Sequence, residues 1–279
     1  MLINEFEGSG PIRVLHRRSC RVALGLMIER CIGKEIKMGA NCFGEFVGTA
    51  VLVLLGDGVL ANVLLRKSKA EGAGWLAIST GWAFAIVSGV FAAIACGSPN
   101  PALNPAVSLG LAIETGDFSK LIPFLVAQML GAMVGALLVW LNFLPHWSRT
   151  EDPCAKLACF STMPAIQNFG ANLLSEAIGS FMLVLGVAAI SSKEVAISGP
   201  AAGLGPYLAG VVVCGIVLSP GGTTGYAINP ARDLGPRIVH SLLPLGKKMG
   251  SGWGYAIVPV LGPLMGATLA GLFVRIARF

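Results

Sequence analysis

The chain has 279 residues, of which 54% are hydrophobic and only 12% are charged, and its mean hydropathy is +0.75. Roughly a quarter of the residues are charged in an ordinary soluble domain, so this composition argues against a soluble globular protein and indicates a membrane protein. The net charge of +6 is weak evidence for nucleic-acid binding, because the basic residues lie mostly in an N-terminal arm and in loops, without interleaved aromatic residues. Attraction to anionic lipid is the simpler account.

Residues 1–37 differ from the rest because they carry seven Lys or Arg residues. The apolar run at 22–28 is too short for the core of a signal peptide. We interpret this segment as a basic, amphipathic arm on the cytoplasmic face of a membrane. The alternative is a mis-assigned start, since Met38 would open the chain directly before the first long apolar run.

Apolar runs of about 20 residues are long enough to cross a bilayer. The chain has six, at 39–64, 74–97, 119–143, 169–191, 204–219 and 252–275. Two further segments, 105–115 and 230–240, are too short to span a membrane and too apolar to be solvent loops. We therefore predict an all-α membrane protein with six transmembrane helices and two re-entrant half-helices, in a single domain over 38–279.

The same tripeptide opens both half-helices. It reads Asn104-Pro105-Ala106 in the first and Asn229-Pro230-Ala231 in the second. Asn is a good N-cap, and proline is tolerated in the first turn, where its missing N–H costs nothing. A helix that starts inside a membrane needs protein or water around its first turn. Two such starts therefore suggest a pore.

The triplet that starts at Asn100 also reads Asn-Pro-Ala. If Asn100 were the cap, Pro105 would fall inside the half-helix and break its hydrogen bonding. We therefore predict that the first half-helix is capped by Asn104.

The two halves of the domain, at about 38–143 and 169–275, repeat each other. The segment 44–49 resembles 175–180, and 131–138 resembles 262–269, both at an offset of 131. Each half has three spans, so the second half must cross the membrane in the opposite direction. The half-helices then enter from opposite faces, and their N-termini, each with roughly half a positive charge, meet near the middle. Such a site repels cations and still presents two Asn amides to a neutral hydroxyl.

Over about residues 39–275 the chain resembles the major intrinsic proteins, and within them the aquaglyceroporins, or glycerol uptake facilitators. The resemblance rests on the two Asn-Pro-Ala motifs in an inverted repeat. Glu45 and Glu176 match the buried glutamates that brace the family's re-entrant loops. The resemblance implies an aquaporin-like fold, a passive channel without enzymatic activity or cofactor, and a homotetramer with one pore per subunit.

The resemblance further implies a multi-pass protein of the cell membrane with both termini in the cytoplasm. The Lys and Arg counts support this orientation only with the N-terminal arm included, at 11 inside against seven outside. Without the arm the count is four against seven, contrary to the positive-inside tendency.

The resemblance also implies an outer constriction, or selectivity filter, of four side chains. They are Trp82 on the second span, Val217 on the fifth, Tyr226 three residues before the second motif, and Arg232 directly after it. Arg232 would donate to two adjacent hydroxyls, a geometry that suits arginine better than lysine.

Two of these assignments depend on how the chain is matched to the family. An ungapped match gives Phe84 in place of Trp82, but the segment before Asn104 looks longer than usual, which favours Trp82. Val217 stands where glycerol facilitators often have Gly, and it is expected to tighten the pore. Asp233, after the arginine, marks the glycerol branch of the family.

We therefore predict a passive channel for glycerol and other small neutral solutes, with water as a second permeant, that excludes protons and ions. The alternatives are a channel whose main permeant is water, urea, lactic acid or hydrogen peroxide, or a coupled secondary transporter, which also uses inverted repeats and broken helices. A transporter usually needs an ionisable group at the midplane, and Arg232 is a poor proton carrier.

Three smaller features complete the sequence. No Cys/His cluster has metal-ligand spacing, so no metal site is predicted. Cys154 and Cys159 share one loop, where an oxidising exterior would permit a disulfide, although free thiols are favoured. Asp57, near the outer end of the first span, fits either the pore mouth or the solvated interface.

Overall fold

The computed structural model describes the backbone at residues 12–195, 197–201 and 203–278, and the side chains in these ranges from residue 35 onward. The chain divides into two compact units, residues 1–39 and 40–279, and helix α1 (Ile12–Leu64) contributes to both. In the first unit the described backbone is helical. The amphipathic character of the basic arm concerns side chains that lie outside the described residues, so the arm and its boundary after residue 37 stay predictions.

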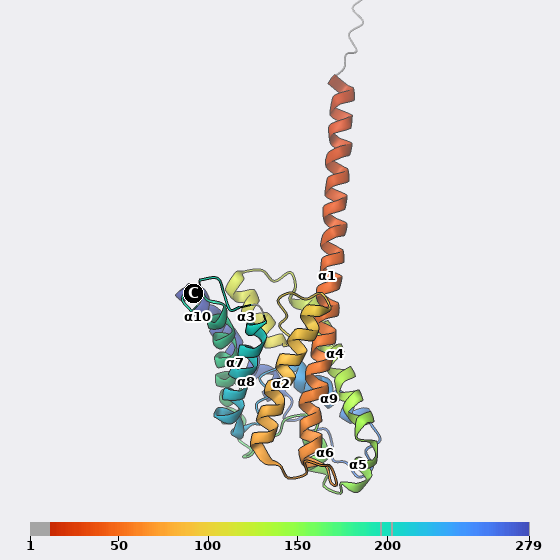
Figure 1. Cartoon of the computed structure of the whole chain (residues 1–279), viewed down its shortest axis with the longest axis vertical. Coiled ribbons are helices and arrows are strands. Elements are labelled where there is room, and N and C mark those ends of the chain that lie inside the picture. Colours follow the sequence, from red (N-terminus) through yellow and green to blue (C-terminus); the bar gives the residue numbers. More distant parts are fainter. Residues whose placement is uncertain (1–11, 196, 202, 279) are drawn as a thin grey trace, which may run out of the picture. The chain divides into compact units, whose positions relative to one another are not determined.

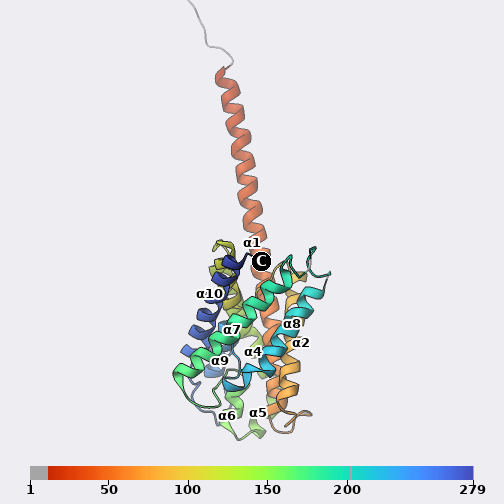
Figure 2. The ribbon, with the colours of Figure 1, turned by 90° about the vertical axis from the view of Figure 1, so that its left-hand side faces the viewer.

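The larger unit is a bundle of helices, and its described residues contain no strand. Figures 1 and 2 show the helices from two directions, with the short helices α5 and α6 at one end of the bundle and the C-terminus at the other. After α1 the elements are α2 (Gly74–Ala95), α3 (Pro105–Thr115), α4 (Leu121–Asn142), α5 (Leu144–Arg149), α6 (Pro153–Ala158), α7 (Phe169–Ser191), α8 (Leu204–Leu218), the 3-10 turn η1 (Pro220–Thr223), α9 (Pro230–Leu242) and α10 (Ile257–Ala277).

The predicted fold class is confirmed. Five helices of the described chain are long and apolar enough to cross a membrane: the Glu35–Leu64 part of α1, α2, α4, α7 and α10. The fifth predicted span, α8, has 15 residues. It rises about 22 Å, so flanking segments such as η1 must complete its crossing. The last span begins at Ile257 instead of 252, because residues 252–256 form turns that start at Gly252, whose φ is +63°.

The two halves pack in the same way through equivalent glycines. On α4, Gly131 and Gly135 face the backbone carbonyls of Phe46 and Ala50 on α1. On α10, Gly266 faces the backbone carbonyl of Ala177 on α7. Small residues let helix backbones approach closely inside a membrane, and these glycines have that role here. The half-helix α3 packs against α10, and α9 packs against α4, so each half-helix lies against a long helix of the other half.

We expect Gly266→Ala to destabilise the protein by about 1–3 kcal/mol or more, because an added Cβ would overlap the carbonyl oxygen of Ala177 and force α10 away from α7. The measurement is the thermal unfolding midpoint of the purified protein in detergent. Gly58→Ala is the matched control, since a Cβ at Gly58 meets no atom within 4 Å and alanine favours a helix. Equal midpoints for both variants would contradict the proposed packing.

Candidate functional site

The N-termini of the half-helices α3 and α9 meet inside the bundle. Asn104 caps α3 by accepting a hydrogen bond from the N–H of Ala106 (2.8 Å), and Asn229 caps α9 by accepting from the N–H of Ala231 (3.0 Å). The Nδ2 of Asn104 donates to the carbonyl of Ile228, and the Nδ2 of Asn229 donates to the carbonyl of Leu103, each at 2.8 Å. A side-chain amide has two N–H donors, so each Asn retains one for a solute.

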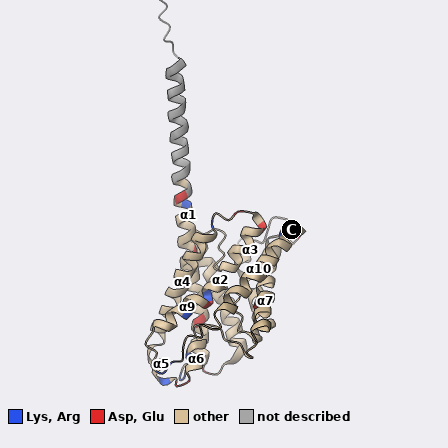
Figure 3. Cartoon of the chain, turned by 180° about the vertical axis from the view of Figure 1, so that it is seen from behind, with Lys and Arg blue, Asp and Glu red and all other residues tan. Residues whose placement is uncertain are grey.

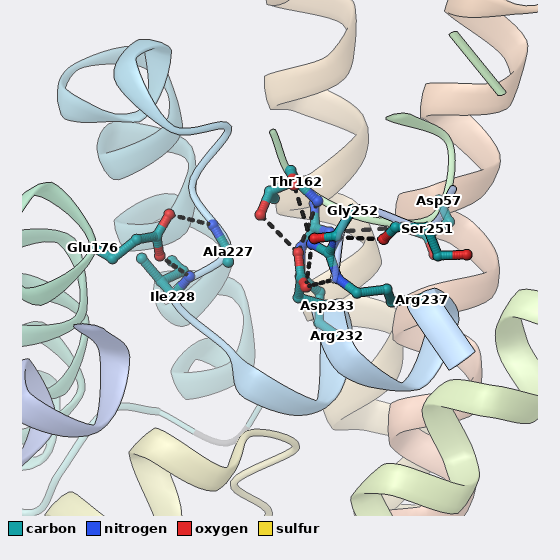
Figure 4. A network of polar contacts seen from close by, with 10 residues as sticks. All are labelled: Asp57, Thr162, Glu176, Ala227, Ile228, Arg232, Asp233, Arg237, Ser251 and Gly252. Atoms are coloured by element: carbon teal, nitrogen blue, oxygen red, sulfur yellow. Dashed lines mark hydrogen bonds and ion pairs between the residues drawn. The ribbon is translucent and has the colours of Figure 1, made fainter. Parts of the chain in front are cut away.

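Buried glutamates hold the segments that precede both half-helices. Glu176 on α7 accepts from the N–H groups of Ala227 (2.9 Å) and Ile228 (2.7 Å), as Figure 4 shows. Glu45 on α1 accepts in the same way from Ala102 (2.9 Å) and Leu103 (2.8 Å). Both glutamates are at most 1% exposed. These contacts are the geometry expected of loop-bracing residues.

The first half has an additional support that the sequence did not reveal. The Nε2 of Gln128 on α4 donates to Glu45 (2.8 Å) and to the hydroxyl of Ser108 on α3 (2.9 Å). Its equivalent in the second half, at the repeat offset of 131, is Pro259, which has no such donor. The two loops are thus held by related but unequal sets of hydrogen bonds.

The braced loops adopt a strained backbone. Leu103, Tyr226 and Ile228 have φ values of +52°, +49° and +40°. This region is uncommon for residues other than glycine and is unfavourable for a branched side chain such as that of Ile228. Leu103 and Ile228 both lie directly before a capping Asn, and their carbonyls accept from the opposite Asn. The strain is therefore located where the backbone must turn its carbonyls toward the meeting point of the half-helices.

One cavity lies at this meeting point, and a second adjoins it. The smaller, of about 50 Å³, is lined by residues that include Trp82, Tyr226, Arg232 and both capping asparagines. The larger, of about 580 Å³, reaches Thr115 at the end of α3 and Ser191 at the end of α7. They share the lining residues Ile86, Ala102, Val107, Leu183 and Val213. The two cavities therefore adjoin, with the smaller beside Arg232 and the larger toward the ends of α3 and α7.

Three of the four predicted constriction residues lie together. The Cζ atom of Arg232 lies 4.1 Å from the ring centroid of Trp82 and 5.6 Å from that of Tyr226. The two rings meet edge to face, with centroids 6.0 Å apart. Phe84, the residue given by the ungapped match, is 58% exposed on the outside of α2. The structure thus places Trp82, and not Phe84, against Arg232.

Val217 is less directly placed. It is fully buried on α8, but it does not line the smaller cavity, where Val213 of the same helix does. Its carbonyl accepts from the Nε1 of Trp75 (3.1 Å), and the Trp75 ring lies edge-on to Tyr226 with centroids 5.5 Å apart. Sequence reasoning missed Trp75, because it lies at the start of α2, seven residues before the aromatic residue that the motif pattern selects.

Asp233 lies in a buried network beside Arg232 (Figure 4). It accepts from the N–H and the hydroxyl of Thr162 (both 2.7 Å) and from the Nε and Nη2 of Arg237 (2.9 and 2.7 Å). Arg237 also donates to the carbonyls of Ser251 and Gly252. The network ties α9 to the loop after α6 and to the loop before α10. The i,i+4 spacing of Asp233 and Arg237 was visible in the sequence, whereas Thr162 left no signal there.

Asp57 lies inside the bundle and not at a solvated interface. It is 0% exposed, and its Oδ1 lies 4.0 Å from the Nη1 of Arg232. Figure 3 shows blue and red ribbon segments, which mark basic and acidic residues, among the helices beside α9. In the described part of the chain, four polar groups near the constriction have no hydrogen-bond partner: the Asp57 carboxylate, Trp82 Nε1, Tyr226 Oη and Arg232 Nη1. The three donors among them are buried and unpaired.

Hydrogen bonds also order the end of the bundle near α5 and α6. The Nζ of Lys248 donates to the carbonyls of His240, Ser241 and Leu243, which satisfies the C-terminus of α9. Burial, and then the charges of Lys248 and Arg237, lower the pKa of His240 to about 4. The imidazole is therefore neutral at pH 7, and its contribution to stability is lost as the pH falls from about 6.5 toward 4.

The two loop cysteines are not bonded to each other. Cys154 is exposed, with its Sγ 3.6 Å from the Sδ of Met249. Cys159 is buried, and its thiol donates to the carbonyl of Ala155. The structure thus has free thiols at both positions. The described residues contain no group of His, Cys, Asp and Glu side chains that could hold a metal ion.

Comparisons with known proteins show which family the chain resembles. The family model described as "Major intrinsic protein" matches residues 33–274. The chain is 49% identical to glycerol uptake facilitator protein 3 of Lactiplantibacillus plantarum, over 86% of this chain and 97% of that protein. It is also 49% identical to a probable glycerol uptake facilitator protein of Thermotoga maritima, over 81% and 94%. Among solved structures, it resembles the aquaglyceroporin from Plasmodium falciparum, with a TM-score of 0.74 at 26% identity, over 85% and 96% of the two chains.

Proposed function

The chain belongs to the major intrinsic protein family, and from this premise we propose that it is a passive membrane channel that conducts glycerol and other small neutral solutes, with water as a second permeant. The observation that carries the proposal is the meeting of two Asn-capped helix starts beside Arg232, Trp82 and Tyr226 along one path. The high identity to glycerol uptake facilitators over nearly their whole length supports glycerol as the main solute.

The constriction suits a molecule with hydroxyls on one side and carbon on the other. Arg232 offers N–H donors, while the rings of Trp82 and Tyr226 form an apolar corner beside it. Further along the path, the free amide hydrogens of Asn104 and Asn229 offer the next donors. A polyol can therefore exchange its hydration water for this series of donors while its CH groups contact the rings.

The same geometry opposes cations. The N-termini of α3 and α9 point at one place, and each carries roughly half a positive charge. A proton that moves along a file of water molecules would have to pass this point, where both Asn side chains donate to the file. We infer that the channel excludes protons and ions without any gate or energy source, and that it performs no chemical step.

The family also suggests how the protein is placed and assembled. We propose that it lies in the cell membrane with both termini in the cytoplasm, so that α5, α6 and the Arg232 constriction face the outside. The wide cavity would then open to the cytoplasm. We further propose a homotetramer in which each subunit has its own pore, as the resemblance implies.

The test is glycerol uptake by proteoliposomes, followed by stopped-flow light scattering. We expect re-swelling in glycerol that is faster than in protein-free vesicles and that survives ionophores which dissipate the proton and sodium gradients. A rate that collapses with either gradient would indicate a coupled transporter. Failure to re-swell in any lipid mixture would indicate that the protein is not an open glycerol pore.

Val217→Gly tests the fourth constriction residue. Glycine would remove a buried side chain one helical turn beyond Val213, at the residue whose carbonyl accepts from Trp75. We expect this change to speed larger polyols more than it speeds water, because pore width limits the larger solute first. Permeabilities for water, glycerol and a five-carbon polyol, measured in the same vesicles, give the ratio. An equal effect on all three would remove Val217 from the filter.

A further inference from the structure

Asp57 is a buried carboxylate that the path described above does not use. Its side chain is 0% exposed, and neither oxygen has a hydrogen-bond partner in the described part of the chain. The nearest cation is the guanidinium of Arg232, whose Nη1 lies 4.0 Å from Oδ1. Figure 4 shows Asp57 on α1, beside the group formed by Arg232, Asp233 and Arg237. A buried carboxylate without hydrogen bonds needs a strong electrostatic reason to be tolerated.

The residue before Asp57 contacts the other side of the constriction. A Cβ at Gly56 would overlap the ring of Trp82, so the α1 backbone lies directly against this ring. The Cζ of Arg232 lies 4.1 Å from the centroid of the same ring. Two consecutive residues of α1 therefore support the two partners of one cation–π contact: Gly56 supports the ring, and Asp57 faces the guanidinium.

The charges near Arg232 leave Asp57 as its counter-ion. Asp233 is closer in sequence, but its Oδ1 accepts from Arg237 and its Oδ2 accepts from Thr162. Asp233 and Arg237 therefore form their own ion pair, at 2.7 Å and fully buried. Within the described residues, Asp57 is the one carboxylate with an oxygen within 4.0 Å of a guanidinium nitrogen of Arg232.

Resting on the proposed function, we propose that Asp57 is a positioning and specificity-determining residue: it holds the Arg232 guanidinium against Trp82 and cancels its charge without occupying its donors. A separation of 4.0 Å is too long for a hydrogen bond, so the attraction is electrostatic and Nη1 forms no hydrogen bond with Asp57. A neutral hydroxyl then meets good donors, whereas a small anion meets a dipole instead of a net positive charge. Asp57 thereby keeps the constriction from becoming an anion site.

The experiment compares Asp57→Asn, Asp57→Glu and wild-type protein in proteoliposomes. Glycerol and water fluxes are measured with thiocyanate added outside at constant ionic strength, in exchange for the bulkier gluconate. We expect wild type and Asp57→Glu to be insensitive to thiocyanate. In Asp57→Asn, thiocyanate is expected to block both fluxes at concentrations at least roughly fivefold below any that affect wild type, since removal of a charge at 4 Å matters by that factor even at the dielectric constant of water. Glu151→Gln, which removes one exposed negative charge, is the matched control and stays insensitive.

The outcomes separate this proposal from the proposed function. If wild-type protein conducted no glycerol, the proposed function would be wrong. The effect of thiocyanate on the water flux of wild type and Asp57→Asn would still test the role of Asp57. Thiocyanate block in wild type, or Asp57→Asn with altered flux but no block, would reduce Asp57 to a packing role and overturn the inference. If Asp57→Asn does not reconstitute, Asp57→Ser, which also lacks the charge, undergoes the same comparison.

Discussion

Arg232→Ala is expected to make the pore leak small monovalent cations while it still passes water. The guanidinium is a buried positive charge 4.0 Å from Asp57, so its loss removes one positive charge from the constriction. A unit charge at 4 Å contributes about 4 kcal/mol at an effective dielectric constant of 20, which corresponds to roughly a thousandfold change in cation access. Methylammonium uptake into proteoliposomes measures the effect, and discrimination among polyols should fall as well.

Two variants make this result interpretable. Arg232→Lys retains the charge and should still exclude methylammonium, but it should slow glycerol because an ammonium lacks the planar fork of donors. Arg149→Ala removes an exposed positive charge and should leave both fluxes unchanged. Methylammonium uptake by Arg232→Ala that equals the wild-type value would mean that the arginine does not contribute to the cation barrier.

Glu176→Ala is expected to destabilise the protein strongly, because it removes the brace of the second half-helix. It leaves the buried N–H groups of Ala227 and Ile228 without their acceptor, at about 1–3 kcal/mol each. Without this brace, Ile228 can leave its unfavourable φ of +40°, and its carbonyl then no longer accepts from Asn104. At about 1–3 kcal/mol for each group, the free energy of unfolding should fall by roughly 2–6 kcal/mol in total. This is a large share of the stability of a typical protein, so most of the variant should be unfolded at about 37 °C.

Glu176→Gln provides the graded comparison, because its carbonyl oxygen can still accept one of the two hydrogen bonds and should retain part of the stability. Glu194→Ala, in an exposed loop, is the neutral control. Thermal unfolding midpoints and the monodisperse fraction in detergent give the order: wild type, then Glu176→Gln, then Glu176→Ala. Unchanged midpoints in both Glu176 variants would show that this loop does not depend on its brace.

Local rules were sufficient for the framework of the protein. The first half-helix was predicted at 105–115 and lies at Pro105–Thr115, and the second was predicted at 230–240 and continues to Leu242. Capping by Asn and the tolerance of proline in the first turn define where a helix begins, and these signals are read directly from neighbouring residues. Apolar runs define the spans by the same local logic, except where turns at 252–256 delay α10.

Side-chain contacts between distant segments could not be predicted in this way. The position of Asp57 beside Arg232 depends on how α1 is rotated about its axis, and that rotation is set by close packing at glycines such as Gly56. Thr162 binds Asp233 from a loop that has no motif. Val217 was assigned by counting along an ungapped match, whereas the wall of the smaller cavity contains Val213. The roles of the four filter residues in selectivity stay predictions.

The central claim is that two Asn-capped helix starts beside one arginine form a path for neutral hydroxylated solutes that protons cannot follow. The most direct test records glycerol entry and internal pH in the same proteoliposomes, under an imposed pH gradient and with valinomycin present to clamp the membrane potential. The account predicts rapid glycerol entry, while the internal pH drifts no faster than in protein-free vesicles. Glycerol entry at the protein-free rate, or a protein-dependent pH change in step with the solute, would contradict it.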